Sequence, residues 1–273
     1  MIKPGEIQAI ANLQKVRDIQ IEKDYIITWL LIGLSQNEYL SEKLLFKGGT
    51  ALKKAYYPDY RFSEDLDFTF VGNVFDKDEI LNAFGEIFEW AYEESRLKFT
   101  VKEITELSTG NVNFYAGYIG PLGGDGSKKD LKVDISQDEK IYYPPEDRKI
   151  YAGYSDVEGD FVCKCYSLGE IVSEKMRTLM ERTTPRDLYD LWYLLEEEGM
   201  DIEDYVFGFQ EKAAFKGLDS NDFVNKVNSK KKTLKSQWEQ YLAHQINDLP
   251  DFEDVWRDFG KHLRRFSKFM EGG

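Results

Sequence analysis

Two acids that alternate with large apolar residues limit the folds open to this 273-residue chain. In the stretch 65–70, Asp-Leu-Asp-Phe-Thr-Phe, every second residue is apolar, which is typical of a β-strand with one buried face. Alternate side chains of a strand share a face, so Asp65 and Asp67 project together, roughly 7 Å apart. Neighbouring carboxylates raise each other's pKa unless a cation lies between them. The pattern therefore predicts a strand that presents two hard oxygen ligands of the kind that Mg²⁺ prefers.

A paired glycine, Gly48-Gly49, precedes this strand and leads into a predicted helix over residues 50–56. Glycines let the backbone approach a ligand closely, and the N-terminal amides of a helix would face it. We interpret Thr50 as the N-cap of this helix or as a hydroxyl for a phosphate. The spacing of a Walker A loop is absent. The turn predicts a phosphate cradle beside a metal platform; the alternative is that Asp65 and Asp67 form the solvated face of an edge strand.

Asp134 is a third candidate ligand. In Lys-Val-Asp-Ile over residues 132–135, its side chain should lie on the opposite face from Val133 and Ile135. If this strand neighbours the strand of the first two acids, three carboxylates converge, as two-metal phosphoryl transfer requires. A third acid can bridge a second metal or take the proton of an incoming hydroxyl. The alternative is an exposed acid on a hairpin.

These motifs resemble those of the AbiEii/AbiGii-type nucleotidyltransferase toxins, relatives of the MenT toxins. The first family motif is similar to Gly-Gly-Thr-Ala-Leu, a spacer, and then Arg-x-Ser-x-Asp-hydrophobic-Asp. The matching residues are Gly48, Gly49, Thr50, Ala51, Leu52, Arg61, Ser63, Asp65 and Asp67. Further matches lie in 132–135, in 170–175 with Arg177 and Arg182, and in 186–191. The resemblance runs from about Lys47 to Leu195, and the last quarter of the chain carries no matching motif.

The resemblance implies a nucleotidyltransferase that uses one or two Mg²⁺ ions and a nucleoside triphosphate. The implied catalytic residues are Asp65, Asp67, Asp134, Lys175 and Asp187, of which the first three would bind metal. The implied nucleotide-binding residues are Lys47, Gly48, Gly49, Thr50, Arg61, Ser63 and Lys175. The implied acceptor is an RNA such as tRNA, and a neighbouring antitoxin would relieve the growth arrest. Whether the antitoxin binds directly stays open.

Residues 167–182 predict a helix that begins with a Ser-x-x-Glu capping box. A cation at Lys175 suits phosphoryl transfer, because charge develops on the leaving pyrophosphate; the alternative is a solvated lysine. Pro185 is well placed in the first turn of the next helix, which carries Asp187. A structural ion pair of Asp187 with Lys175 or Arg177 is a second interpretation, and it is compatible with the first if the pair orients Lys175.

The order of the predicted elements indicates two domains. Helical periods cover 6–22, 25–40, 50–56 and 77–96, and strand patterns cover 98–107, 111–119, 131–135 and 161–166. Short connections, including the glycine-rich turn 120–126, favour antiparallel pairing. From residue 167 only helical periods remain. We therefore predict an α+β fold: a nucleotidyltransferase-like mixed sheet with flanking helices over 1–166, then a helical bundle over 167–273 that completes the active-site cleft.

The net charge of −14 argues against a protein that coats nucleic acid through its overall field. An RNA acceptor would need a local basic patch. Two groups of cations near the C-terminus are candidates for it: Lys212, Lys216, Lys226, Lys230, Lys231, Lys232 and Lys235, and Lys261, Arg264, Arg265 and Lys268. Charged helix faces are usually only solvated, and the aromatic residues between these groups are expected to pack the bundle.

No signal peptide or membrane span is expected, because the start of the chain is polar and the longest apolar run, 25–34, is too short for a bilayer. We therefore predict a cytoplasmic protein with no membrane partner. Cys163 and Cys165 are interpreted as buried free thiols, and both histidines as surface or packing residues.

Two other functions stay open at this stage. The same site could transfer a nucleotide to a small molecule or a protein, which the acidic charge favours. The chain could also bind a nucleotide such as GTP without turnover, although an intact set of Asp65, Asp67 and Lys175 argues against a dead site. Spacing does not reveal which nucleotide is used.

Overall fold

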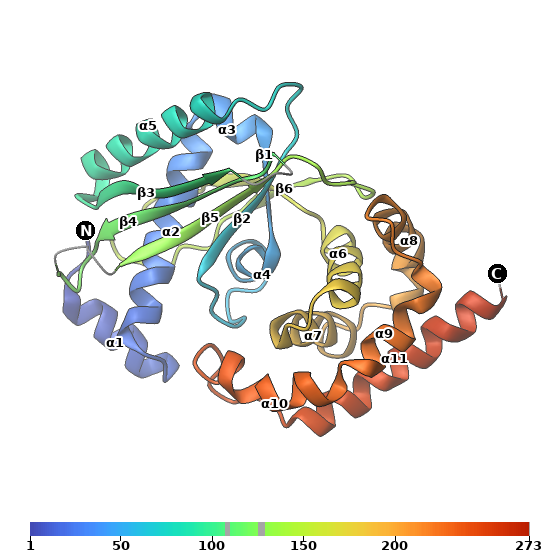
Figure 1. Cartoon of the computed structure of the whole chain (residues 1–273). Helices are drawn as coiled ribbons and strands as arrows, with labels where there is room; N and C mark the ends of the chain where they lie inside the picture. Colours follow the sequence, from blue (N-terminus) through green and yellow to red (C-terminus); the bar gives the residue numbers. More distant parts are fainter. Residues whose placement is uncertain (107–109, 125–128, 273) are drawn as a thin grey trace. The chain divides into compact units, whose positions relative to one another are not determined.

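A mixed β-sheet forms the centre of the N-terminal part of the chain (Figure 1). The computed structural model describes residues 1–106, 110–124 and 129–272, and within them seven strands pair in the order β3-β4-β5-β2-β1-β7-β6. The strands are β1 (Leu44–Lys47), β2 (Asp65–Phe70), β3 (Lys98–Glu106), β4 (Val112–Ile119), β5 (Asp130–Ser136), β6 (Glu146–Lys149) and β7 (Val162–Cys165). β2 runs parallel to β5 and β1 runs parallel to β7, while the other neighbours are antiparallel.

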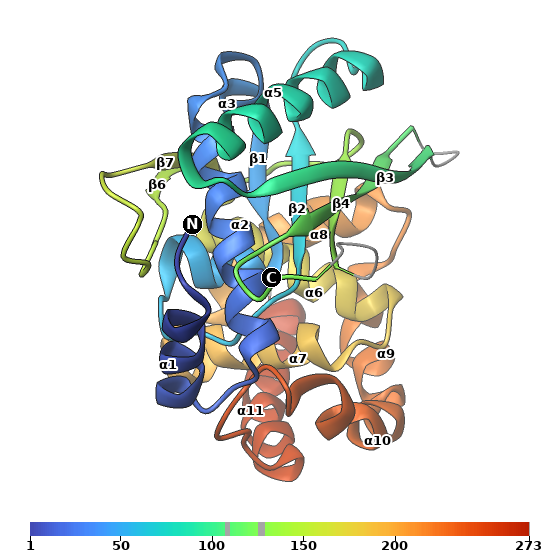
Figure 2. The same ribbon diagram turned by 90° about the vertical axis from the view of Figure 1, so that its left-hand side faces the viewer.

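Long helices cover one face of this sheet (Figure 2). The helices of this part are α1 (Pro4–Gln14), α2 (Asp18–Gln36), α3 (Glu38–Lys43), α4 (Gly48–Ala51) and α5 (Lys77–Ser95), and a π-helical turn, η1 (Leu52–Tyr56), follows α4. Gly33 of α2 faces Ile87 and Trp90 of α5, where an added Cβ would lie 2.7 Å from Ile87, so glycine allows the two helices to pack closely. Phe84 of α5 meets Phe114 of β4 edge to face, with ring centroids 4.9 Å apart.

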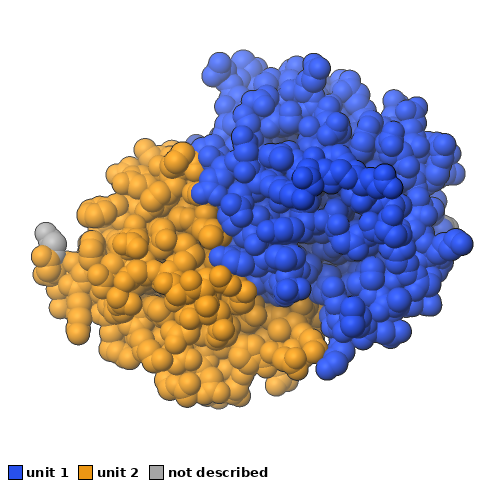
Figure 3. Space-filling model, turned by 180° about the vertical axis from the view of Figure 1, so that it is seen from behind, with its two compact units in different colours: residues 1–139, 145–166 blue, residues 140–144, 167–273 orange. Residues whose placement is uncertain are grey.

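The chain divides into two compact units (Figure 3). Unit 1 comprises residues 1–139 and 145–166, and unit 2 comprises residues 140–144 and 167–273. Unit 2 is helical: α6 (Leu168–Glu181), α7 (Pro185–Trp192), η2 (Tyr193–Glu197), η3 (Ile202–Tyr205), α8 (Val206–Phe215), η4 (Ser220–Asp222), α9 (Phe223–Ser229), α10 (Lys231–Leu242) and α11 (Phe252–Gly272). Its core is aromatic, and Phe209, Phe223 and Phe266 are fully buried against one another. No helix among the described residues is long and apolar enough to cross a membrane.

Several predicted elements are confirmed and others are corrected. The helix over 77–96 and the antiparallel pairing of β3, β4 and β5 are confirmed. The single helix predicted over 6–22 is wrong, because Lys15 adopts φ 54° and ends α1 before α2 begins. The helix predicted over 25–40 is likewise divided, since α2 ends at Gln36 and α3 follows. The predicted strand end at 107 and the end of the predicted turn at 125–126 lie outside the described residues.

The structure also bears on the predictions for the cysteines and the histidines. Cys163 and Cys165 are buried free thiols, as predicted, and burial raises the pKa of Cys163 to about 12. His262 is buried and lies 2.8 Å from the carboxylate of Glu196, so it packs within the helical unit.

Candidate functional site

Three acids and a lysine occupy one face of two adjacent strands. β2 and β5 pair in parallel with Asp67 opposite Asp134 and Asp65 opposite Lys132. Residues opposite each other in this register project to the same face, about 4.8 Å apart in the hydrogen-bonding direction. The intervening residues, among them Leu66 and Val133, are buried on the other face. The sheet register thus brings together the three acids that the sequence nominates.

Lys132 is already engaged with the third acid. Its ammonium lies 2.6 Å from Oδ2 of Asp134, and both side chains are about one-third exposed or less. Partial burial works against the charged ammonium, but the hydrogen bond and charge of Asp134, with the charge of Asp65, raise the pKa of Lys132 above its ordinary value. Lys132 therefore stays cationic at neutral pH beside the acids.

The glycine turn lies directly against the second acid. Gly48 has φ +81°, and a Cβ placed on it would lie 2.6 Å from Oδ2 of Asp67. The backbone of the turn therefore approaches this carboxylate more closely than any side-chain-bearing residue allows. Lys47 is the register partner of Asp67 on β1, and its ammonium lies 3.6 Å from Glu139. The glycine turn and the acid strand, for which the sequence predicts phosphate and metal binding, are therefore adjacent in unit 1.

Thr50 has a different role from the N-cap that the sequence predicts. The helix begins two residues earlier, at Gly48, and its N-cap is Lys47. The buried hydroxyl of Thr50 donates a 2.5 Å hydrogen bond to the backbone carbonyl of Asp65. This bond ties the helix of the glycine turn to the start of the acid strand, so Thr50 holds the two motifs together.

Arg61 and Ser63 lie in the loop between the turn and the acid strand. Arg61 is buried; its guanidinium donates to the carbonyl of Phe62 at 3.2 Å and lies over the ring of Tyr60. Ser63 is half-buried. The loop thus holds Arg61 in contact with its own residues, and the predicted phosphate contacts of both side chains stay predictions.

The donor set suits a hard divalent cation. Carboxylate oxygens are the protein ligands that Mg²⁺ takes, and Asp65, Asp67 and Asp134 share one face with the glycine backbone beside them. Among the described residues, no three acids, histidines or cysteines are gathered closely enough to form a ready-made metal centre. Within this group, the ammonium of Lys132 already binds one oxygen of Asp134.

In unit 2, Lys175 forms the centre of a buried ion-pair cluster. Its ammonium lies 2.8 Å from Asp187 and 2.7 Å from Asp190, and Arg182 lies 2.6 Å from the other oxygen of Asp187. Burial alone would raise the pKa of Asp187, but the charges of Lys175 and Arg182 outweigh it and hold this pKa below its ordinary value. The ion pair that the sequence offers as a second interpretation is therefore present, with Asp190 as an additional partner; the predicted catalytic roles stay predictions.

The start of α6 confirms half of the predicted capping box. The hydroxyl of Ser167 accepts a 3.4 Å hydrogen bond from the backbone N–H of Glu170. The carboxylate of Glu170 does not return to the cap; it accepts from the backbone N–H groups of Tyr142 and Tyr143 at 3.1 and 2.9 Å. Lys212 of α8 pairs with its other oxygen at 2.6 Å.

Several lysines of the candidate RNA-binding group have partners within unit 2, and their predicted contact with RNA stays a prediction. Lys212 is buried against Glu170 and Glu174. Lys230 donates to the last carbonyls of α6, and Lys231 and Lys235 pair with Glu253. Lys261 and Arg265 of α11 also pair with acids. Arg264 and Lys268 are exposed on α11 and have no acid partner among the described residues.

Sequence reasoning did not nominate Lys132 as a member of its cluster, and it gave Asp190 only a role in tying the two helices together. Lys132 stands two residues before Asp134, and the period of a strand places both on one face. Asp190 stands three residues after Asp187, a helical neighbour position. Both signals are present in the sequence, but each is common on solvated surfaces.

Comparison with known proteins bears on the family and the fold of the chain. Residues 29–262 match the model of the AbiEii family, described as a nucleotidyl transferase toxin of a type IV toxin–antitoxin system. A search among curated proteins finds no match. The fold is similar to that of MenT4, a nucleotidyltransferase toxin from Mycobacterium tuberculosis H37Rv, with a TM-score of 0.68 and 18% identity over 99% of this chain and 90% of that one. It is also similar to JHP933 from Helicobacter pylori, with a TM-score of 0.58 and 18% identity over 94% and 95% of the two chains.

The family match covers most of the chain and includes the glycine turn, the acid strand and both helical motifs. The α+β nucleotidyltransferase-like fold predicted from the sequence is confirmed. The chain belongs to the AbiEii family of nucleotidyltransferase toxins of type IV toxin–antitoxin systems.

Proposed function

We propose that this chain transfers a nucleoside monophosphate from a nucleoside triphosphate to a hydroxyl of RNA, with tRNA as the leading acceptor, and that one or two Mg²⁺ ions assist. The observation that carries the proposal is the shared face of Asp65, Asp67 and Asp134 beside the backbone of Gly48. A neighbouring antitoxin, direct or indirect in its action, would relieve the resulting growth arrest.

In this proposal the acids of unit 1 hold the metal, and Mg²⁺, when bound, polarises the phosphate oxygens and neutralises their charge. The backbone of Gly48 and Gly49 is proposed to receive the triphosphate, because Gly48 carries no side chain and lies directly against the carboxylate of Asp67. Lys47, next to Asp67 in the sheet, supplies a cation to the phosphates. Thr50 acts through its hydrogen bond to Asp65, and by that bond it fixes the turn to the acid strand.

Arg61, Ser63 and Lys175 are proposed to contact phosphates, and Asp187 is proposed to orient Lys175. The 2.8 Å pair between the buried side chains of Lys175 and Asp187 supports the orienting role of Asp187. The two carboxylates fix the position of the ammonium, and a positioned cation suits stabilisation of a leaving pyrophosphate.

The deciding experiment incubates the purified protein with each of the four α-labelled nucleoside triphosphates and a pool of purified RNA. Label should enter RNA with wild-type protein and fall at least 100-fold, on the order of the loss seen when one transition-state contact is removed, in Asp65→Asn and Asp67→Asn. Asp147→Asn, an exposed aspartate of β6, is the matched control and should retain full activity. Circular dichroism checks that the variants are folded. Undiminished transfer by folded Asp65→Asn and Asp67→Asn would remove the metal-site assignment.

The acidic net charge of −14 favours a second candidate, transfer to a protein or a small molecule. The same assay with protein and small-molecule acceptors in place of RNA separates the two candidates. Binding of a nucleotide such as GTP with no release of pyrophosphate under any condition would instead support a sensor without turnover.

A further inference from the structure

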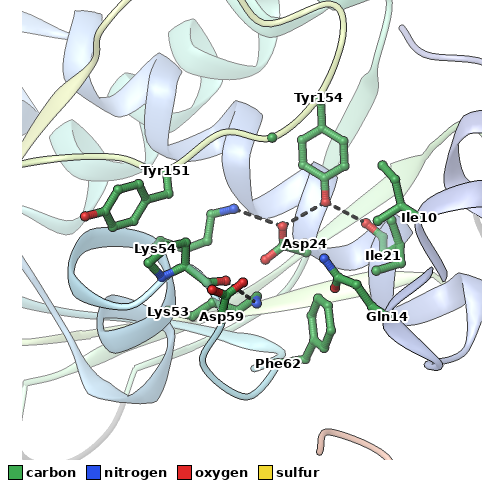
Figure 4. Close-up of a pocket in the computed structure, with 12 residues that line it drawn as sticks. Ile10, Gln14, Ile21, Asp24, Lys53, Lys54, Asp59, Phe62, Tyr151 and Tyr154 are labelled. Carbon is green, nitrogen blue, oxygen red and sulfur yellow. Dashed lines mark hydrogen bonds and ion pairs between the residues drawn. The ribbon is translucent and has the colours of Figure 1, made fainter. Parts of the chain in front are cut away.

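Unit 1 contains a cavity of about 190 Å³ that none of the proposed nucleotide or metal ligands lines (Figure 4). Residues of α1, α2, the π-helical turn η1 and the segment 151–154 surround it. Ile10, Ile21 and Phe62 provide apolar wall, while Asp24, Lys53 and Lys54 bring charged groups to it. Figure 4 shows these charged side chains converging from α2 and η1.

Two of the buried charged residues of the lining, Asp24 and Lys54, pair with each other. The ammonium of Lys54 lies 2.9 Å from Oδ2 of Asp24, and the hydroxyl of Tyr154 lies 2.8 Å from the same oxygen. Burial alone would raise the pKa of Asp24, but the charges of Lys54 and then Lys53 outweigh it and lower this pKa. Asp24 is therefore an anion whose charge is matched by Lys54.

Lys53 has no such partner. Its ammonium donates to the carbonyls of Pro58 and Tyr60 at 3.0 and 2.9 Å and lies 4.1 Å from the ring centre of Phe62. Among the described residues, no carboxylate lies within ion-pair distance of it. An ammonium has three N–H donors, so two carbonyls leave one for the cavity.

The buried charges around the cavity do not balance. Lys53 and Lys54 are 6% and 3% exposed, and Asp24, 7% exposed, is the buried acid that faces them. Asp59, also on the wall, is exposed to solvent. Burial of an unpaired charge is costly, and desolvation, partly offset by Asp24, lowers the pKa of Lys53. An anion in the cavity would balance the second ammonium and accept its remaining N–H.

We propose that this cavity binds a compact anion with a phosphate or carboxylate head group, for which the ammonium of Lys53 is the counter-ion. Water takes about 30 Å³ of liquid volume per molecule, so the cavity accommodates a head group with a short organic body. It is smaller than the roughly 300–1,000 Å³ typical of drug-sized ligands, so it would not accept a whole nucleotide.

The bound anion would contact the helix that leaves the glycine turn. Lys53 belongs to η1, which continues directly from α4 and its Gly48. π-helical turns often occur at functional sites, and this one places two consecutive lysines on the cavity wall. The anion site is nonetheless separate in its residues from the proposed transfer site, so the two proposals stand or fall independently.

The test measures the unfolding temperature of the full chain against the concentration of inorganic phosphate, with acetate as the carboxylate arm and potassium chloride at equal ionic strength as the reference. Phosphate, acetate or both should raise the unfolding temperature saturably, from which a Kd follows. The anion with the lower Kd identifies the head group. No saturable effect of either anion beyond that of chloride overturns the proposal.

Two glutamines of α1 provide a matched pair of variants. Gln14 lines the cavity and Gln8 does not, and both are exposed on the same helix. Gln14→Glu places a negative charge at the cavity and should weaken anion binding by about threefold, whereas Gln8→Glu should leave the Kd unchanged. Equal Kd values for the two variants and wild type would assign the anion to another site and overturn the proposal.

Lys53→Met removes the counter-ion and keeps the length of the side chain. Replacing a buried charge with an apolar group is often neutral or stabilising, so we expect a folded protein that has lost the anion-dependent rise in unfolding temperature. A folded Lys53→Met protein that binds the anion with wild-type Kd contradicts the role of Lys53. If this variant does not fold, the glutamine pair still decides the proposal.

Discussion

Gly48 shows how one residue joins the two motifs of the site. Its positive φ suits glycine, and the space in which a Cβ would stand belongs to the carboxylate of Asp67. Two separate costs therefore arise if another residue replaces it. The first is backbone strain, and the second is displacement of a proposed metal ligand.

A pair of alanine substitutions separates these costs. Gly217 has φ +70° and nothing within 4 Å of an added Cβ, so Gly217→Ala should carry only the backbone cost of about 1 kcal/mol in the free energy of unfolding. Gly48→Ala should destabilise the protein more and should abolish nucleotide transfer, because Asp67 must move. Urea unfolding and the labelled-nucleotide assay measure the two effects. If Gly48→Ala loses no more stability than Gly217→Ala and keeps full activity, Asp67 needs no open backbone beside it.

Lys132 gives a second prediction for a single residue. Its ammonium binds one oxygen of Asp134, so in the proposed site it would compete with a metal for this ligand. Lys132→Met should therefore tighten Mn²⁺ binding, measured by electron paramagnetic resonance without nucleotide, on the order of three- to tenfold. Lys98→Met, an exposed lysine of β3, serves as the control. Unchanged or weaker Mn²⁺ binding in Lys132→Met would mean that Lys132 does not compete at this position.

Sequence periods predict which residues share a face, but not which strands become neighbours. Asp65 and Asp67 were predictable as a pair from the alternation in β2 alone. Their meeting with Asp134 depends on the parallel pairing of β2 with β5, which no local pattern encodes. The sheet edge β6 was missed because Glu-Asp-Arg-Lys has no apolar alternation. The break at Lys15 was missed because apolar residues keep a helical period on both sides of it.

At the scale of elements, the pairing of Lys175 with Asp187 joins α6 to α7. Asp187 is buried with its pKa lowered by Lys175 and Arg182, so its charge stabilises the folded state. A lowered pKa contributes stability that is present above the ordinary carboxyl pKa of 3.8 and is lost as the pH falls through the lower folded value. The two helices should therefore loosen in acid and not in base.

Asp187→Asn tests this directly, because it keeps the shape of the side chain and removes its charge. At pH 7 the variant should lose about 3 kcal/mol in the free energy of unfolding, since Lys175 and Arg182 lose a buried partner. The difference from wild type should persist at pH 5 and shrink below about pH 4. Urea denaturation at several pH values measures it, with the exposed Glu239→Gln of α10 as the control. A difference that does not depend on pH would mean that the charge of Asp187 is not what stabilises α6 against α7.

At the scale of the whole molecule, the overall charge opposes the proposed acceptor. A chain of net charge −14 repels RNA at long range, so any attraction must come from cations that acids of the chain do not already neutralise. Glu170 pairs with Lys212, and Glu253 pairs with Lys231 and Lys235, so these acids offset part of the positive charge of the first group. Arg264 and Lys268, one turn apart on the exposed side of α11, satisfy the requirement better.

Two double charge reversals distinguish local from global electrostatics, since each pair makes the chain more acidic by the same amount. Arg264→Glu with Lys268→Glu should raise the KM for RNA and reduce the slope of log binding constant against log salt by about 2, with the KM for the nucleotide unchanged. Lys231→Glu with Lys235→Glu removes lysines that Glu253 already holds, so it should change the RNA parameters much less. Labelled-nucleotide transfer at several salt concentrations measures both. If both pairs change the KM for RNA and the salt slope equally, RNA responds only to the net charge of the protein. If neither pair changes them, the RNA contacts lie on residues other than the C-terminal cations.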